Sequence, residues 1–273
     1  MRIRTDLSTA HCIVEQEGKT LIVTLSRPET KNALSGPMLL GMYRAWRELD
    51  KNDELICAIL TGQGDTFCSG KDLKKGINES GPEDEEFLRV MADVPNIHWQ
   101  ALLRENQPMK PVILAIEGYA LAGGTEILQG TDIRVAAEDA VLGIIEVQRG
   151  LYPVGGSSVR LRRQIPYCLA AEMLLLGETI TAAQAKQFGL INHVVPKGQA
   201  LAKAREIADR IGENAPLSVK ALTRVLREVP AYIPEQEALD KELEIGWPIL
   251  MTKDAKEGMR AFKEKRKAVF VGE

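Results

Sequence analysis

Short runs of aliphatic and β-branched residues recur along the first half of the chain and contain few polar positions. They lie at 21–25, 56–62, 112–118, 133–137 and 141–144. Runs of this length are typical of buried strands, and the first follows a turn-like Glu-Gly-Lys segment that predicts a hairpin over 12–25. Loops rich in glycine lead from the later runs toward helical stretches, at 61–73, 117–128 and 149–158. This loose strand–loop–helix repeat predicts an α/β fold.

Apolar residues spaced three and four positions apart mark the predicted helices. Ser35 is a residue type that favours helix N-caps. The apolar face that follows it consists of Leu39, Met42, Tyr43, Trp46 and Leu49. From about residue 200 the helical pattern dominates, at 201–211, 216–229 and 254–266, with Asp254 as the expected cap of the last helix. We therefore predict an α/β core over residues 1–200 and a helical oligomerisation region over 201–273.

Composition narrows the classes of function. The chain has 273 residues, of which 45% are hydrophobic and 27% charged, as in an ordinary globular enzyme. A net charge of −3 and a pI near 5.8 argue against a broad basic face for nucleic acid. The apolar runs are too short to span a bilayer, and the first residues lack the apolar core of a secretory signal. We therefore expect a cytoplasmic protein with neither a membrane nor a nucleic-acid partner.

Cysteine spacing gives no sign of a metal site. Cys12, Cys57, Cys68 and Cys168 are scattered without a Cys-x-x-Cys pair, so we interpret them as reduced packing residues. No Cys/His cluster or His-Glu-x-x-His motif occurs, and we expect no metal. The acidic segment 78–87 is interpreted as a solvated loop with the start of a helix, although its position between two glycine loops could also border a substrate entrance.

The stretch ALAGGTEILQG places a carboxylate, Glu126, shortly after Gly123 and Gly124 among small and apolar residues. Paired glycines allow the backbone to turn sharply beside a ligand. If a helix begins there, its first amide N–H groups have no intrahelical partner and can hold an oxyanion, with Glu126 close by. The same short pattern also fits a simple glycine packing contact followed by an acid that offsets the helix dipole.

The loop TFCSGKDL could supply a second donor, because Gly70 follows a predicted strand and has small neighbours. Two amides from separate loops that point at one position would form an oxyanion hole. The loop could equally be a plain strand-to-helix turn. For Lys71 we favour a role of the main-chain N–H over one of the ammonium group, since a lysine in an exposed loop is usually solvated.

A second carboxylate, Glu146, stands among apolar residues at the end of a predicted strand. Burial raises the pKa of a carboxyl group and allows it to exchange protons near neutral pH. Two such acids beside an oxyanion hole suit the addition or removal of water next to a carbonyl group. The other interpretation of Glu146 is a structural ion pair with Arg149 or Arg160.

Together these motifs resemble the crotonase (enoyl-CoA hydratase/isomerase) superfamily. The resemblance covers almost the whole chain and rests on Arg-Pro…Lys-Asn-Ala-Leu (27–34), FCSGKDL (67–73), GYALAGGTEI (118–127) and GIIE (143–146). It implies a repeated ββα spiral core with a C-terminal helical trimerisation region. This sequence departs from the family pattern at Ala122, where a glycine is common, at Lys71, where the hydratases often have alanine, and at Ile145, where proline is frequent.

The resemblance implies the reversible syn addition of water to a trans-2-enoyl-CoA, which gives a 3-hydroxyacyl-CoA. In that family two backbone N–H groups bind the thioester oxygen, and they fall here on Lys71 and Gly123. Two glutamates twenty residues apart serve the hydratases, and they fall on Glu126 and Glu146. Glu126 would orient and activate water at C3, and Glu146 would protonate C2.

Coenzyme A contacts are also implied by the resemblance, and CoA enters as part of the substrate, with no separate cofactor. The expected contact residues in the core are Lys31, Ala33, Cys68, Gly70, Lys71, Asp72, Leu73 and Gly123. Phe262 and Lys265 match family positions that reach CoA, often across a subunit boundary. The family further implies a homotrimer or a dimer of trimers.

Alternatives remain at this point. Within the family, a Δ3,Δ2-enoyl-CoA isomerase needs one acid to move a proton between carbons, and other crotonase-type dehydratases use related chemistry. A non-catalytic acyl-CoA binder or an RNA binder belongs to a different class, and both the acidic pI and the two glutamates argue against it. The acyl group could be a short or medium fatty chain, a carnitine-like group or a bulky sterol side chain.

Overall fold

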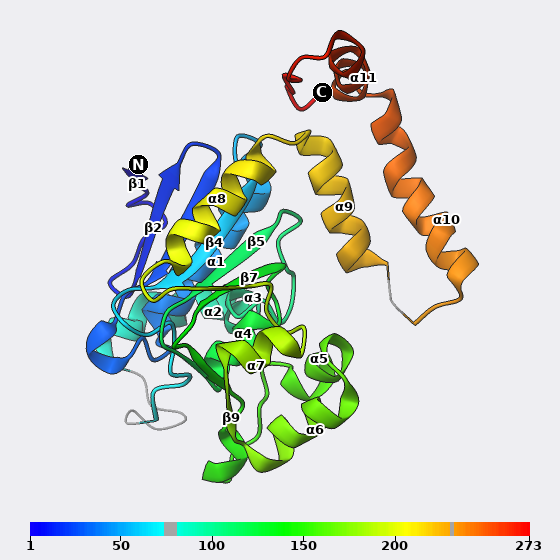
Figure 1. Ribbon diagram of the computed structural model, residues 1–273. Helices are drawn as coiled ribbons and strands as arrows, with labels where there is room; N and C mark the ends of the chain where they lie inside the picture. Colours follow the sequence, from blue (N-terminus) through cyan, green and yellow to red (C-terminus); the bar gives the residue numbers. More distant parts are fainter. Residues whose placement is uncertain (74–80, 230–231) are drawn as a thin grey trace.

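The structure is a computed structural model that describes residues 1–73, 81–229 and 232–273. Within these ranges the strands form one large and one small sheet (Figure 1). The strands are β1 (Arg2–Ile3), β2 (Cys12–Glu17), β3 (Thr20–Leu25), β4 (Cys57–Gly62), β5 (Val112–Ile116), β6 (Tyr119–Leu121), β7 (Ile133–Ala137), β8 (Val141–Gly143), β9 (Thr179–Thr181) and β10 (His193–Val195).

Helices cover the sheets and extend beyond them. The α-helices are α1 (Gly36–Lys51), α2 (Glu85–Asp93), α3 (Ile97–Ala101), α4 (Gly123–Leu128), α5 (Ser157–Gln164), α6 (Tyr167–Leu176), α7 (Ala182–Gln187), α8 (Ala200–Gly212), α9 (Pro216–Glu228), α10 (Glu235–Gly246) and α11 (Lys253–Glu264). The 3-10 helices are η1 (Pro28–Thr30), η3 (Pro82–Asp84), η4 (Glu146–Arg149) and η5 (Trp247–Met251).

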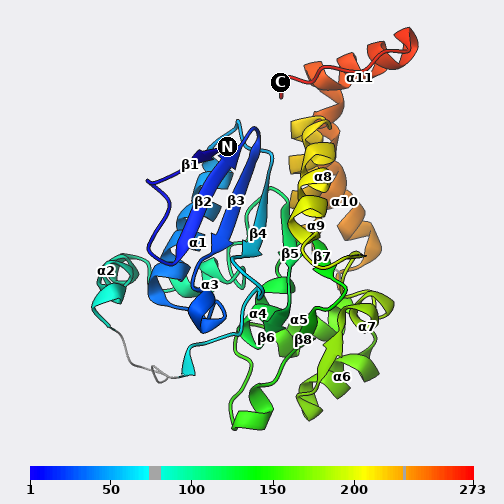
Figure 2. The same ribbon diagram turned by 60° about the vertical axis from the view of Figure 1, so that its left-hand side comes forward.

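The large sheet has the strand order β1-β2-β3-β4-β5-β7-β10. Its first strands are antiparallel, and β2 and β3 form the hairpin predicted over 12–25. From β3 onward the neighbours are parallel, and their residues are almost all buried, which agrees with the unbroken apolar runs in the sequence. The small sheet, β6-β8-β9, lies below the carboxyl ends of these strands (Figure 2).

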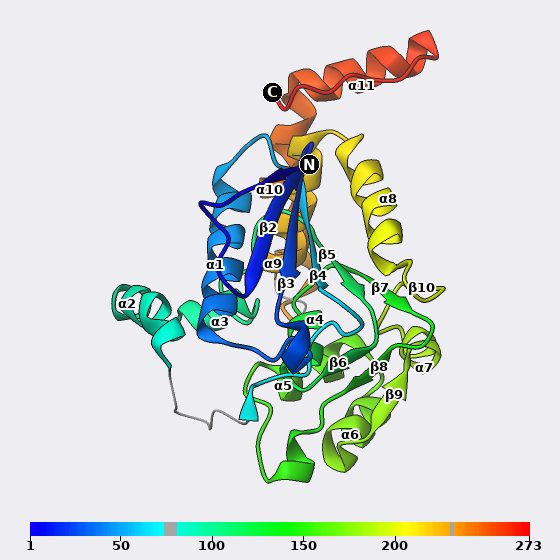
Figure 3. The ribbon, with the colours of Figure 1, turned by 90° about the vertical axis from the view of Figure 1, so that its left-hand side faces the viewer.

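Two helices pack on opposite faces of the large sheet, as the edge-on view in Figure 3 shows. On one face α1 buries Met38, Met42 and Trp46 against the main core. On the other, α8 packs Ala204 and Ile207 against β4, β5 and β7. The predicted boundary between the α/β core and the helical region, at residues 200 and 201, falls at the start of α8. This helix is part of the sheet's core. The helices that extend away from the sheets begin with α9 (Figure 1).

Of the two N-cap residues that the sequence predicts, Ser35 is confirmed and Asp254 is not. The Ser35 side chain accepts a hydrogen bond from the Met38 N–H and caps α1, as predicted. The prediction that Asp254 caps the last helix is wrong, because Thr252 accepts the N–H of Ala255. Asp254 is buried instead and accepts the N–H groups of Val271 and Gly272, which fold the C-terminal residues back onto α11.

The acidic segment 78–87 is described from residue 81 onward, and its first three residues lie outside the described ranges. The interpretation as a solvated loop is wrong for Asp84, which is buried. Its Oδ1 atom accepts the N–H of Gly36 at 3.0 Å. This bond ties η3 to the first turn of α1.

Candidate active site

Backbone hydrogen bonds join the two glycine loops that the sequence singled out. The Cys68 N–H donates to the Tyr119 carbonyl, and the Leu121 N–H donates to the Cys68 carbonyl, both at 2.9 Å. Gly70 then turns with a φ of 90°, a conformation that favours glycine. A Cβ at Gly70 would lie only 2.7 Å from the Ala122 Cβ and 3.2 Å from the Gly123 amide nitrogen. The structure thus brings the turn at Gly70 directly against the start of α4.

Helix α4 begins at Gly123, as the sequence predicted, after an unusual backbone turn at Ala122 with φ 50° and ψ −119°. The Thr125 hydroxyl fixes this turn, because it donates to the Ala120 carbonyl and accepts the Gly143 N–H. Among the described residues, no acceptor binds the Gly123 N–H, as expected for the first residue of a helix. An amide donor therefore stands next to Gly70, at the place where the sequence predicted an oxyanion hole.

Glu126 is buried in the first turn of α4, with 6% of its surface exposed. Its Oε1 atom accepts the Ser157 N–H at 3.4 Å, and Gly155 packs so closely that a Cβ there would lie 2.5 Å from Oε2. Burial raises the pKa of Glu126, and the amides of Ser157 and Gly155 oppose that rise. The carboxyl group is consequently held in place by the start of α5.

Glu146 is the first residue of η4, and its Oε2 atom is buried without a hydrogen-bond partner. Burial and the nearby Glu126 carboxylate raise the pKa of Glu146 to about 7. A like charge disfavours ionisation, and in this way the Glu126 carboxylate adds to the effect of burial on Glu146. Within the described part of the chain, no ion pair joins Glu146 to Arg149 or Arg160, so the structural interpretation of this acid is wrong.

The predicted CoA contacts of the core lie in two adjoining segments. The Lys31 carbonyl accepts the Ser69 N–H, and the Leu34 N–H donates to the Gly70 carbonyl, so segments 31–34 and 68–73 run side by side. These segments bring together Lys31, Ala33, Cys68, Gly70, Lys71, Asp72 and Leu73.

Several of these side chains are buried or already paired. Cys68 and Ala33 are buried, and the Asp72 carboxylate pairs with Arg27 at 3.1 Å. Lys31 pairs with Asp65 at 2.9 Å. The backbone is therefore the part of these segments best placed to meet CoA.

Phe262 and Lys265 are not brought to this site within one chain. Both belong to the end of α11, where Phe262 is 86% exposed. Figures 1 and 3 show α11 at the opposite end of the molecule from α4. A contact of these residues with CoA requires a second subunit, and it stays a prediction.

The groups that hold Glu126 are not evident from the local sequence around it. The glycines before Ser157 suggest only a contribution to the shape of the acyl pocket, yet Gly155 and Ser157 contact the carboxyl group. Paired glycines before Ser157 are themselves a signal for a helix start with open amides, and the same signal precedes Glu126. Arg104 also lies near Glu126 and lowers its pKa, and no local pattern marks this residue.

We expect replacement of Glu146 by glutamine to change the pH dependence of stability. The folded protein raises the pKa of Glu146 from 4.5 to about 7, so folding favours the protonated form. That contribution is complete below pH 4.5 and is lost as the pH rises through 7. The Glu146→Gln protein should therefore gain thermal stability relative to wild type as the pH is raised over this window. Thermal unfolding measures the difference, and the exposed Glu138→Gln variant should show no such trend.

The described residues provide neither a membrane-spanning helix nor a cluster of metal ligands. None of the helices is both long and apolar enough to cross a membrane. No cluster of His, Cys, Asp and Glu in the described ranges could hold a metal ion.

Known proteins are similar to this chain in sequence and in fold. The model of the enoyl-CoA hydratase/isomerase family matches residues 15–273. The enoyl-CoA hydratase EchA19 of Mycobacterium tuberculosis is 52% identical over 254 residues, which cover 93% of this chain and 94% of that protein. The mevalonyl-coenzyme A hydratase of Aspergillus fumigatus is 38% identical over 250 residues, covering 90% of this chain and 89% of its own.

A solved structure gives the same result. The enoyl-CoA hydratase from Bacillus anthracis superposes with a TM-score of 0.86 at 32% identity, covering 96% of this chain and 100% of its own. The fold is thus that of the crotonase superfamily, as predicted. The chain belongs to the enoyl-CoA hydratase/isomerase family.

Proposed function

We propose that the protein is an enoyl-CoA hydratase that adds water reversibly and in syn geometry to a trans-2-enoyl-CoA. The product is a 3-hydroxyacyl-CoA. The observation that carries this proposal is a pair of carboxyl groups with raised pKa values, the buried Glu126 and the half-buried Glu146, whose pKa the Glu126 carboxylate helps to raise. Addition of water across a double bond needs one group that takes a proton from water and one that gives a proton to carbon.

The amides of Lys71 and Gly123 are proposed to bind the thioester oxygen. Hydrogen bonds to that oxygen stabilise the enolate that forms when water adds at C3. Gly70 lets the two loops meet because it has no Cβ. The Leu34 N–H donates to the Gly70 carbonyl at 2.8 Å. This bond holds the peptide plane between Gly70 and Lys71, from which the Lys71 N–H projects.

The two carboxyl groups are proposed to have different roles. Glu126 accepts hydrogen bonds from the amides of Ser157 and Gly155, which stabilise its ionised form, so it is the better general base for water. Glu146 has an unpaired buried oxygen and a pKa of about 7, so it is the better donor of a proton to C2.

Product analysis tests this proposal. The purified protein is incubated with a panel of trans-2-enoyl-CoA thioesters that carry short fatty, medium fatty, carnitine-like and sterol side-chain acyl groups. We expect conversion of at least one of them to its 3-hydroxyacyl-CoA, detected by mass as the addition of one water. Absence of hydration across the panel, together with binding of the same thioesters, would instead support a non-catalytic acyl-CoA binder.

An isomerase is the second candidate, because an isomerase also needs an oxyanion hole and at least one acid. A 3-enoyl-CoA substrate distinguishes the two activities, since an isomerase shifts the double bond without a change of mass. The presence of two neighbouring acids favours the hydratase. Faster conversion of the 3-enoyl-CoA than of the 2-enoyl-CoA would favour the isomerase.

Self-association as a trimer or a dimer of trimers is also proposed. Helix α10, η5 and α11 extend beyond the sheets (Figure 1). They leave large apolar side chains exposed. These side chains are Leu239, Leu243, Trp247, Leu250, Met259 and Phe262. An exposed apolar surface of this kind is typical of a subunit interface. It would also carry Phe262 and Lys265 toward the CoA of a neighbouring subunit.

Light scattering should give a mass of three or six times the 30.1 kDa chain. Leu243→Glu should reduce this mass, because a buried unpaired carboxylate is unfavourable in an interface. Leu88→Glu, on the exposed side of α2, is the matched control and should leave the mass unchanged. A monomeric mass for the wild-type chain would rule out the proposed assembly.

A further inference from the structure

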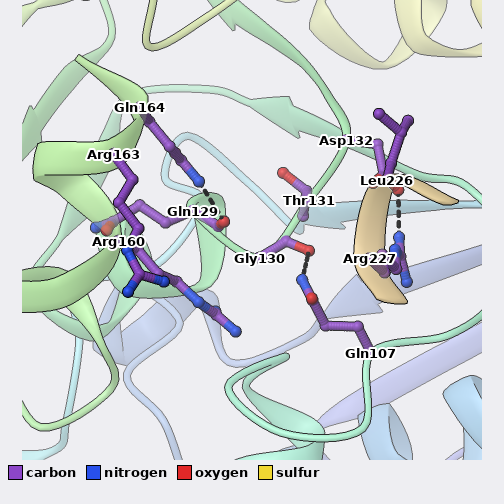
Figure 4. Close-up of a pocket in the computed structure, with 10 residues that line it drawn as sticks. All are labelled: Gln107, Gln129, Gly130, Thr131, Asp132, Arg160, Arg163, Gln164, Leu226 and Arg227. Atoms are coloured by element: carbon purple, nitrogen blue, oxygen red, sulfur yellow. Dashed lines mark hydrogen bonds and ion pairs between the residues drawn. The ribbon is translucent and has the colours of Figure 1, made fainter. Parts of the chain in front are cut away.

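A pocket apart from Glu126 and Glu146 lies between α5, the loop that follows α4 and the C-terminal end of α9. Its volume is about 220 Å³. Figure 4 shows the side chains around it, with arginines of α5 on one side and Arg227 of α9 on the other. It is lined by Gln107, Gln129, Gly130, Thr131, Asp132, Arg160, Arg163, Gln164, Leu226 and Arg227. The carboxyl groups of the proposed active site do not line it.

Arg227 brings an incompletely paired guanidinium group to this pocket. Its side chain is only 7% exposed, and its Nη2 atom donates to Asp132 Oδ2 at 2.6 Å. The Nε and Nη1 atoms of Arg227 are buried and have no hydrogen-bond partner in the described structure. The Asp132 carboxylate does not accept from these two atoms, and its Oδ2 atom also accepts the Val112 N–H at 2.7 Å. Two donors of a charged group are therefore left without an acceptor.

Arg160 repeats this arrangement on the opposite wall. Its Nη2 atom donates to the Arg104 carbonyl at 2.9 Å, while its Nη1 atom is buried without a partner in the described ranges. The Nη1 atom lies close to the pocket floor, since a Cβ at Gly130 would be 3.3 Å from it. Burial and the cations Arg104 and Arg227 lower the pKa of Arg160, and the Glu126 carboxylate opposes this change.

Two of the amide side chains around the pocket are engaged elsewhere, whereas the Oε1 atom of Gln129 is a buried acceptor without a partner in the described structure. Gln107 donates to the Gly130 carbonyl and Gln164 donates to the Gln129 carbonyl, so both fix the loop after α4 (Figure 4). The Oε1 atom of Gln164 already accepts from Arg134. With Arg160, Arg163 and Arg227 against the single carboxylate of Asp132, the lining carries an excess of positive charge.

We propose that this pocket binds a small oxyanion, namely a phosphate or carboxylate group. Leaving a buried charged N–H group unpaired is costly, and an oxyanion is the ligand that accepts from several guanidinium N–H groups at once. The three arginines come from both walls, so an anion between them would face positive charge on both sides. The site does not depend on the proposed hydratase activity.

The test is calorimetric titration of the full-length protein with inorganic phosphate and, separately, with acetate, at constant pH and ionic strength with chloride as the reference. We expect saturable binding of at least one anion, at about one per chain. Arg163→Gln and Arg227→Gln should each weaken it by about tenfold or more, since each removes a charged partner. Arg163 is the safer variant for folding, because its side chain is exposed and its guanidinium group lies over the Tyr232 ring at 5.2 Å.

The matched control is Arg224→Gln, on the same helix as Arg227 but paired with Glu228 outside the pocket. It should bind the anion as the wild type does. Preference for phosphate or for acetate identifies which of the two groups the pocket takes. The proposal is overturned if neither anion binds saturably, or if Arg163→Gln binds as tightly as wild type. In the case that neither anion binds, the masses of the variants show whether a second copy of the chain occupies the pocket instead. The Arg163→Gln and Arg227→Gln chains would then lose self-association that Arg224→Gln retains.

Discussion

Replacing Glu146 with glutamine is expected to lower the rate of enoyl-CoA hydration by about 10²–10⁴-fold, the usual contribution of a general acid. Glutamine keeps the size of the side chain but has no proton that it can give to C2. The carboxyl group of Glu146 is suited to that transfer because its pKa is about 7, so both protonation states are populated at neutral pH. Steady-state kinetics with the best enoyl-CoA of the panel would measure the loss.

Binding should survive this substitution. Glu146 makes no hydrogen bond through Oε2 in the described structure, so the amide does not break an existing contact there. Affinity for a non-reactive acyl-CoA should stay close to that of wild type. Glu138→Gln serves as a control, because this exposed carboxylate lies just after β7 and outside the site. Hydration by Glu146→Gln at the rate of the control would show that Glu146 does not donate the proton.

Local sequence patterns predict the inner strands of the large sheet, from β2 to β7, and the start of the first long helix, but not the edge strands β1 and β10. Buried parallel strands appear as unbroken apolar runs, and Ser35 marks the start of α1 by its own chemistry. Helix α10 was not predicted, because its Leu239 and Leu243 are exposed in the single chain and it has no apolar face packed on the core. Asp254 was misassigned for a related reason. An aspartate that caps a helix and an aspartate that accepts hydrogen bonds from a distant segment look alike in sequence. Here Asp254 accepts the N–H groups of Val271 and Gly272.

The candidate site divides in the same way. The glycines before Glu126 announce a sharp turn and a helix start within one short segment, so their arrangement could be predicted. The partners of the carboxyl group could not, because Gly155 and Ser157 reach it only through tertiary folding. The arginine pocket is a stronger example. Arg160 and Arg227 stand 67 positions apart in the sequence, and nothing near either residue indicates that their guanidinium groups face a common cavity.

Gly70→Ala is expected to lower the hydration rate by about 10²–10³-fold, the effect of losing one donor of an oxyanion hole. The new Cβ would lie 2.7 Å from the Ala122 Cβ and 3.2 Å from the Gly123 nitrogen, so the two loops must separate. Separation moves the amides of Lys71 and Gly123 apart, and they can then no longer both reach one thioester oxygen. The rate constant kcat for the enoyl-CoA substrate measures this loss.

Backbone strain alone could also harm the protein, since Gly70 has a φ of 90°. Gly189→Ala controls for this effect, because Gly189 has a φ of 82° and an added Cβ there would have no atom within 4 Å beyond its own chain neighbours. Both variants should lose thermal stability from strain at positive φ, and the clash with Ala122 should add to the loss in Gly70→Ala. Only Gly70→Ala should lose hydration, because only there does the added methyl group push on an amide that faces the substrate. Equal activities of the two variants would mean that the approach of the loops at Gly70 does not serve the reaction, and that the thioester oxygen is bound elsewhere.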